Sequence, residues 1–109
     1  MLFRLALTVL TAATVMSFGA ARAEWAADHK RIYLQECLRT CSENPRLPND
    51  AAKAKCPSYC QCTVEQGEKL FSDAEFVEMD AAAQGGKTTE AINRFIAQLA
   101  FCSRRTWGP

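Results

Sequence analysis

The chain has 109 residues, of which 13 are basic and 12 are acidic, so its formal net charge is +1. A chain of this length forms one domain, and its balanced charge excludes the basic surface that nucleic-acid binding requires. Small domains bury only about 60–65% of the surface that the unfolded chain exposes, so this one needs covalent staples, which its six cysteines can supply.

The N-terminal segment has the three parts of a secretory signal. An arginine near the start supplies positive charge, residues 5–18 are mostly apolar, and Ala21-Arg22-Ala23 forms an A-x-A cleavage site. We expect removal of residues 1–23 by cleavage before Glu24, which leaves 86 residues (109 minus 23). The apolar run is shorter than the roughly 20 residues of a membrane-spanning helix. We therefore expect an exported protein, periplasmic or secreted, with no transmembrane segment after cleavage.

The first helix of the exported part is predicted to run from about Trp25 to Cys41 or Ser42. Its apolar residues recur at spacings of one, three and four, which is typical of an amphipathic helix: Tyr33, Leu34, Cys37, Leu38 and Cys41. Asn44-Pro45 ends the helix, because the residue before a proline avoids helical backbone angles. His29, the only imidazole of the chain, is expected to face solvent.

A loop with two prolines, residues 45–50, leads to a second helix that ends near Phe71. Asn49 or Asp50 can cap the start of this helix. Pro57 lies near its beginning, where a proline removes a backbone donor and clashes with the preceding turn. We therefore expect the helix to consist of two pieces, residues 50–55 and 57–70.

Two more helices are predicted after Phe71. Ser72-Asp73-Ala74-Glu75 fits a capping box and opens a helix over residues 73–83, which Gly85-Gly86 ends. Thr88 or Thr89 caps the last helix, whose apolar face keeps a helical period to the end: Ile92, Phe95, Ile96, Leu99 and Cys102. The tail, residues 106–109, is expected to fray, with the Trp107 side chain folded on the bundle.

No segment alternates between apolar and polar residues for long enough to form a strand. The predicted fold class is therefore all-α: an antiparallel helical hairpin over residues 25–71, with C-terminal helices over residues 73–105 packed on it. Together they form a single small disulfide-rich domain, residues 24–109. Gly67 lies within the second hairpin helix, and its missing side chain is expected to let two helices approach closely.

The cysteines form an even set, and all of them follow the signal: Cys37, Cys41, Cys56, Cys60, Cys62 and Cys102. In a short exported chain an even set predicts a disulfide framework. Residues four apart on a helix share a face, with Cβ atoms about 5–6 Å apart. A disulfide needs roughly 3.5–4.5 Å. Bonds between cysteines of one helix are therefore disfavoured, and the bonds should join different helices.

The short connection between the hairpin helices predicts an antiparallel pair, in which facing residues have a constant sum of positions. Cys37 with Cys60 sums to 97, and so does Cys41 with Cys56, so one register forms both bonds. The parallel alternative would need a crossover that 14 residues with two prolines hardly allow.

The third bond is predicted to be Cys62–Cys102. Cys62 lies two residues beyond Cys60, which on a helix is a turn of about 200°. It therefore faces the other flank of its helix, where the last helix has to dock. Cys102 is the thiol that remains for it.

The pair of CX3C motifs with a 14-residue connection resembles the twin-CX3C helical hairpin of small Tim chaperones and of alpha-hairpinin defence peptides. The resemblance covers residues 33–64, and it implies that the outer cysteines pair with each other and the inner cysteines pair with each other. The layout of the whole chain is similar to that of small exported bacterial cysteine-rich helical proteins with a Tyr-Cys-x-Cys helix. No activity is implied by that likeness.

Two chemical roles compete with structural disulfides. Cys60-x-Cys62 and the CX3C pairs could present thiolates to copper or zinc, but this requires reduced thiols in an oxidising compartment. Redox catalysts typically carry a CX2C pair at a helix start, and this chain has none. We therefore predict structural disulfides, with no metal and no cofactor.

No constellation of residues predicts catalysis, so we predict a non-enzymatic scaffold or binding module that engages another protein outside the cytoplasm. Candidate contact residues are Arg46 and Leu47 in the hairpin loop and Trp107 in the tail. Three alternatives stay open. A protease inhibitor or toxin-like hairpin would present its loop, a periplasmic holdase chaperone would need an exposed apolar groove, and a thiolate metal carrier would need free thiols.

Overall fold

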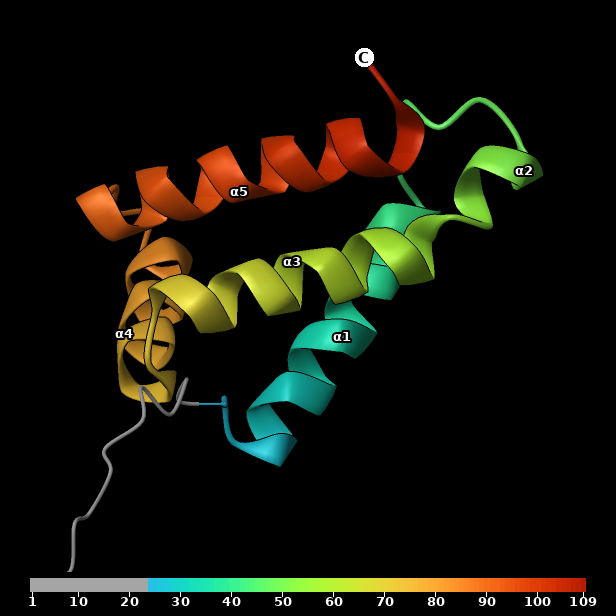
Figure 1. The fold of residues 1–109 in the computed structure, drawn as a ribbon. Helices are drawn as coiled ribbons and strands as arrows, with labels where there is room; N and C mark the ends of the chain where they lie inside the picture. The colour runs from blue at the N-terminus through green and yellow to red at the C-terminus, as the bar shows by residue number, and fades with distance from the viewer. Residues whose placement is uncertain (1–23) are drawn as a thin grey trace, which may run out of the picture.

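The computed structural model of the chain describes residues 24–109, which form helices and no strand, so the predicted all-α class is confirmed (Figure 1). The predicted signal peptide lies outside the described residues. No helix within them has an apolar stretch that would reach across a bilayer. The helices follow in the order α1 (Ala27–Ser42), α2 (Asp50–Lys53), α3 (Cys56–Leu70), α4 (Asp73–Gln84) and α5 (Glu90–Trp107).

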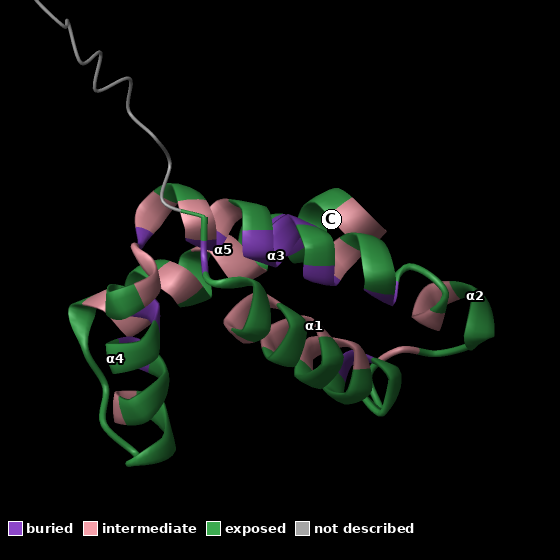
Figure 2. Cartoon of the chain, turned by 90° about the horizontal axis from the view of Figure 1, so that it is seen from below, coloured by how far each residue is buried: buried purple, intermediate pink, exposed green. Residues whose placement is uncertain are grey.

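The central helix of the fold is α3. Both α1 and α5 pack against it, and they lie on opposite sides of it (Figure 1). The short α4 packs against α5 and diverges from α1. Figure 2 shows the buried residues gathered along α3, whereas much of α1 and α4 is exposed. The hairpin with two further helices packed on it is therefore the observed architecture.

The segment before α1 differs from the prediction, because the helix begins at Ala27 and not near Trp25. The Trp25 backbone N–H donates to Glu68 Oε2 at 3.0 Å, and the Ala26 N–H donates to Asp73 Oδ1 at 2.9 Å. The Trp25 ring is buried at 3% exposure. Because the Trp25 ring is anchored in the core, the backbone of Trp25 and Ala26 does not continue the helix. The N–H groups of these two residues donate to side chains of α3 and α4 instead.

The predicted break near Pro57 is present, since α2 ends at Lys53 and α3 begins at Cys56. Pro57 lies in the first turn of α3, where its missing N–H costs no helical hydrogen bond. Asn49 is the residue that caps α2, because its side chain accepts the Ala52 N–H at 2.9 Å. The break leaves Cys56 on the face that α1 covers.

The caps of the last two helices follow the predicted pattern. Ser72 and Glu75 form both hydrogen bonds of the capping box at the start of α4. The Thr89 side chain accepts from the Ile92 N–H at 3.1 Å and so caps α5. The predicted fraying was wrong for residues 106 and 107, because α5 continues to Trp107, whereas the Trp107 ring packs on the bundle as expected.

Three disulfides hold the helices together, and no described cysteine is free. Two of them join α1 to α3, each with 5.9 Å between Cα atoms, and one joins α3 to α5 with 5.8 Å. The pairs are those that the register argument predicts: Cys37–Cys60, Cys41–Cys56 and Cys62–Cys102. They leave α4 as the one helix of eight or more residues that no disulfide holds.

Trp25 is the centre of the apolar core. Its ring stacks on Phe76 with 4.0 Å between centroids, and its Nε1–H donates to the Phe71 carbonyl at 3.2 Å. A Cβ at Gly67 would lie 2.5 Å from the Trp25 Cη2 atom and 3.2 Å from Phe95 Cε2. Gly67 therefore makes room for the Trp25 indole ring, which comes from the segment before α1, next to Phe95 of α5. We expected Gly67 to allow the close approach of two helices, not of a side chain from this segment.

Tyr33 and Thr63 form a buried polar pair that the sequence pattern does not reveal. The Tyr33 hydroxyl donates to Thr63 Oγ1 at 2.7 Å, and the Thr63 hydroxyl donates to the Cys60 carbonyl at 2.8 Å. Thr63 is fully buried, and both of its bonds are satisfied within the bundle. Burial raises the pKa of Tyr33 to about 12, and the hydrogen bond to Thr63 opposes this shift.

We expect this burial to make the protein less stable at alkaline pH. The pKa of Tyr33 is higher in the folded protein than in the unfolded chain, so the stabilisation is present below about pH 10 and is lost as pH rises toward about 12. The loss should reach roughly 2 kcal/mol. Urea unfolding between pH 8 and pH 11 measures how steeply the free energy of unfolding falls with pH, and we expect a steeper fall for the wild type than for Tyr33→Phe. Equal slopes would show that Tyr33 is not the titrating group.

Candidate functional site

The three candidate contact residues come together at one end of the bundle. Arg46, Leu47 and Trp107 line a single cleft of about 390 Å³, although about 60 residues of chain separate the loop from the end of α5. The cleft lies between the end of α1, the following loop, the first turn of α3 and the end of α5. Its other lining residues are Thr40, Cys41, Asn44, Tyr59 and Ser103.

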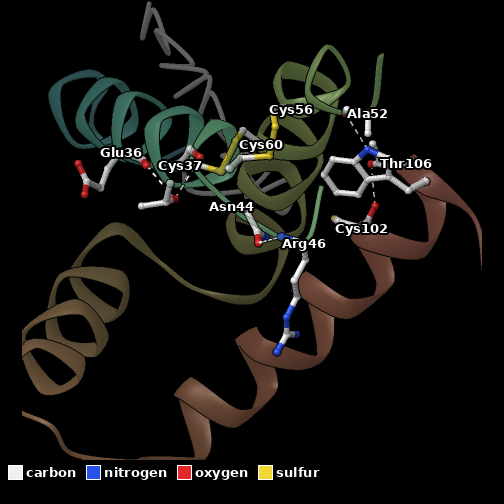
Figure 3. The surroundings of a disulfide bond; sticks show 12 residues. Glu36, Cys37, Asn44, Arg46, Ala52, Cys56, Cys60, Cys102 and Thr106 are labelled. Atoms are coloured by element: carbon white, nitrogen blue, oxygen red, sulfur yellow. Dashed lines mark hydrogen bonds between the residues drawn. A yellow bond between two sulfur atoms is a disulfide. The ribbon is translucent and has the colours of Figure 1, made fainter. Parts of the chain in front are cut away.

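The loop that carries Arg46 is folded into turns. Asn44 Oδ1 accepts the Arg46 N–H at 2.9 Å, and the Asn44 carbonyl accepts the Leu47 N–H at 3.2 Å. Leu47 is half-buried against the two hairpin disulfides. The Arg46 side chain extends away from these disulfides (Figure 3), is exposed, and pairs with no carboxylate of residues 24–109. The loop thus presents the unpaired guanidinium of Arg46 beside the half-buried side chain of Leu47.

Trp107 closes the other side of the cleft and also ties α5 to α2. Its Nε1–H donates to the Ala52 carbonyl at 2.9 Å, and its ring lies 5.0 Å from the ring of Tyr59. Burial raises the pKa of the Tyr59 hydroxyl. Thr106 supports this end of the helix, because its hydroxyl donates to the Cys102 carbonyl at 2.7 Å (Figure 3). Trp107 is therefore held in place before any partner arrives.

The chemistry of the cleft suits binding. It offers one guanidinium, three hydroxyl groups, the Asn44 amide and the aromatic surface of Tyr59 and Trp107, and no carboxylate or imidazole lines it. Arginine and aromatic side chains are the residues that most often dominate protein interfaces. A partner that pairs a carboxylate with Arg46 and lays an apolar group on Trp107 would satisfy both parts of the cleft.

The His29 side chain is 43% exposed, as expected of a solvent-facing histidine, but it also has a partner that the sequence did not indicate. Its Nδ1 atom lies 2.8 Å from Asp73 Oδ1, and the two side chains join α1 to the start of α4. The hydrogen bonds from His29 and from the Ala26 N–H lower the pKa of Asp73. The pair lies away from the cleft, and its partner on α4 is 44 residues along the chain, which a sequence pattern does not indicate.

The described residues contain no cluster of histidine, cysteine and carboxylate side chains that could hold a metal ion. All six cysteines are in disulfides, so no thiolate is available to copper or zinc. Cys60 and Cys62 in particular bond to different helices. A thiolate site would therefore require reduction of at least one disulfide.

Four further residues of the cleft were not among the candidates from the sequence: Thr40, Asn44, Tyr59 and Ser103. For Tyr59 and Ser103, a signal was present in the cysteine register. The Cys62–Cys102 bond implies facing positions on α3 and α5 with a sum near 164, which places Tyr59 opposite the last turn of α5. Each also stands next to a disulfide cysteine, which holds its backbone in place.

Comparison of the chain with protein-family models, with curated proteins and with solved structures finds no match. The resemblance of residues 33–64 to twin-CX3C hairpins therefore stands on the spacing of four cysteines.

Proposed function

We propose that this chain is an exported, non-enzymatic module, periplasmic or secreted, that binds another protein through the cleft formed by Arg46, Leu47 and Trp107. The observation that carries the proposal is the convergence of these three residues in one cleft from two distant segments. The partner segment should carry a carboxylate beside an apolar side chain, because these groups complement the free guanidinium and the aromatic wall.

The disulfides support the compartment. Three bonds in a chain of 109 residues are typical of oxidising environments outside the cytoplasm. They agree with the secretory signal that the sequence predicts. The bonds also substitute for the large core that so short a chain lacks.

The hairpin disulfides also support a binding role. Cys41–Cys56 closes the segment that contains the loop, and Leu47 packs against this bond, so the backbone of Arg46 is held before binding. A preorganised loop loses less conformational entropy when a partner docks. The binding energy is therefore available for contacts rather than for ordering the loop.

The three alternatives lack an observation of this kind. An inhibitor would present an extended segment to a protease, whereas the loop around Arg46 is folded into turns. A metal carrier would need the thiols that the disulfides occupy. A holdase would need a broad apolar surface, and the described residues expose only four large apolar side chains, of which Ile32 and Val77 flank one small groove and Ile96 and Phe101 lie on α5.

Site-specific crosslinking tests the proposal in the exporting cell. A photo-crosslinking amino acid at Leu47 should give one discrete adduct with another protein, whereas the same probe at the exposed Gln35 of α1 should give none. Arg46→Glu should reduce the adduct at least about tenfold, since it replaces a favourable charge contact by a repulsive one.

Arg31→Glu is the matched control, because it makes the same charge change at an exposed position of α1 away from the cleft. It should leave the adduct unchanged. Equal labelling from Leu47 and Gln35, or equal loss in the two arginine variants, would contradict the proposal. The intact mass of the exported form should correspond to a chain that begins at Glu24 or within two residues of it.

A further inference from the structure

A second groove lies between α1 and α4, where the two helices diverge (Figure 2). Its volume is about 420 Å³. It uses the first half of α1, whereas the cleft of the proposed function uses the end of this helix. It is lined by His29, Ile32, Tyr33 and Glu36 from α1 and by Phe76, Val77, Asp80 and Gln84 from α4.

The walls of the groove are apolar and exposed. Ile32 on α1 is 55% exposed and Val77 on α4 is 43% exposed, which makes them two of the few large apolar side chains that face water. Between them lie the rings of Tyr33 and Phe76, 5.6 Å apart and edge to face. Exposed apolar side chains on both walls of one groove mark an interaction surface more strongly than scattered ones do.

The polar groups of the floor are already engaged inside the protein. The Tyr33 hydroxyl donates to Thr63, and the His29 ring pairs with Asp73. The Tyr33 hydroxyl and the His29 Nδ1 atom are therefore not free to bind a ligand, and only the second ring nitrogen of His29 stays accessible. A ligand in the groove would meet an apolar floor in spite of these two polar residues.

Apart from this ring nitrogen of His29, the accessible polar groups are acidic or amide groups at the rim. Glu36 stands on the α1 side, where it also pairs with Arg39. Asp80 stands on the α4 side, where its only described partner is the Gln84 amide at 2.9 Å. No lysine or arginine lines the groove. The rim therefore offers carboxylate acceptors to donors that carry positive charge.

We propose that this groove binds an amphipathic helix of a partner protein whose apolar side chains recur at helical spacing and are flanked by lysine or arginine. The apolar stripe would contact Ile32 and Val77, and the cations would pair with Glu36 and Asp80. This is a common mode of helix recognition in grooves.

A second copy of the chain is a less suitable occupant. The exposed apolar and basic side chains of α5, which include Phe101 and Arg105, are on the helix that lies across α3 from α1 (Figure 1). Docking of α5 from one copy into the groove of another would leave the second groove and the second α5 open. Such a contact propagates from head to tail instead of closing into a dimer.

A synthetic helical peptide of about five turns, with leucines at positions i, i+3, i+4 and i+7 and lysines beside them, is the probe. Its fluorescence anisotropy should show saturable binding to the full chain with disulfides intact. Asp80→Lys should weaken binding by about tenfold or more, because it replaces attraction by repulsion. Val77→Asn should weaken binding to a similar degree by removing one apolar wall.

Two variants are matched controls. Glu78→Lys makes the same charge change on an exposed face of α4 outside the groove, and Phe101→Asn removes an exposed apolar side chain from α5. Both should keep the peptide affinity within about twofold. Equal weakening by Asp80→Lys and Glu78→Lys, equal binding of a peptide with glutamates in place of lysines, or no binding near 1 mM would each overturn the proposal. Self-association of the chain that the peptide reverses would also overturn it, in favour of a second copy.

Discussion

Replacing Trp25 by alanine should lower the free energy of unfolding by about 3–5 kcal/mol. The ring is 3% exposed, stacks on Phe76 and approaches Tyr33 edge to face at 5.7 Å. Its removal leaves a cavity at the junction of α1, α3 and α4, and it orphans the Phe71 carbonyl that accepts the indole N–H. Small domains are stable by only about 5–15 kcal/mol, so a loss of this size is a large share of the total.

Urea unfolding with the disulfides intact measures this change. Trp25→Phe should lose less than the alanine variant, because a smaller aromatic ring still covers Phe76. If Trp25→Ala is too unstable to give a folded baseline, the loss measured for Trp25→Phe still shows whether the ring stabilises the fold. A loss below about 1 kcal/mol for Trp25→Ala would mean that the N-terminal segment does not contribute to the core.

The contact between Trp25 and Gly67 can be tested by a double-mutant cycle. Gly67→Ala should destabilise the protein by about 2 kcal/mol, because the new Cβ would overlap the indole ring at 2.5 Å. In the Trp25→Ala background the same change should become neutral or stabilising by up to about 1 kcal/mol, since alanine favours the helix. A coupling energy near zero would contradict the contact.

Gly85→Ala is the matched control for this cycle. Gly85 is the C-cap of α4, its φ is −79°, and a Cβ there would meet its nearest atoms at an ordinary 3.5 Å. The substitution should change stability by no more than about 0.5 kcal/mol. A large effect at Gly85 would show that loss of glycine by itself, and not overlap with Trp25, lowers the stability.

Removing the Cys62–Cys102 bond by alanine at both positions should lower stability by about 4 kcal/mol, because the bond closes a separation of 40 residues in the unfolded chain. Both sites are buried, so alanine avoids the cost of burying a serine hydroxyl. The hairpin should still form, since its two bonds join α1 and α3 independently. The variant should therefore unfold from α5 inward.

Non-reducing peptide mapping and amide hydrogen exchange test this expectation. Mapping should recover Cys37–Cys60 and Cys41–Cys56 in the variant, and exchange should accelerate in α5 before it accelerates in α3. The bond between Cys41 and Cys56 closes only 15 residues and should contribute about 3 kcal/mol in the same terms. Scrambled hairpin bonds, or a loss below about 1 kcal/mol, would show that α5 does not depend on its disulfide.

The cysteine pairing shows how far local patterns reach. A spacing of four places two cysteines on one face of a helix, and a constant sum of positions follows from an antiparallel pair. These two conditions leave one solution for the hairpin, whose bonds the structure contains. Pro57 is the residue that could have shifted this register, by moving Cys56 off the face of the helix. The shift does not occur, because a new helix begins at Cys56. Pro57 therefore lies in the first turn of α3, and the register between α1 and α3 is kept.

The candidate cleft was predictable only in part. Arg46 and Leu47 are candidate contact residues because they stand in the hairpin loop, and Trp107 is one because it stands in the tail. Nothing in the sequence indicates that the three lie close together. The sequence predicts that Trp107 folds on the bundle, but it does not predict that its indole N–H donates to the Ala52 carbonyl. That bond depends on where α2 stands after the break at Pro57, and such a position is a property of the assembled bundle.

The sequence by itself determined the helices, most of their caps and the disulfide pairs, because these depend on residue spacing along one element or on the register of two neighbouring elements. Only the tertiary structure decided that Trp25 enters the core outside α1, that His29 pairs with Asp73, and that Arg46 and Trp107 line one cleft. Each of these contacts joins residues more than 40 positions apart in the chain or draws on several elements at once. Their partners are selected by side-chain shape and unsatisfied polar groups in three dimensions, and no period along the sequence encodes that choice.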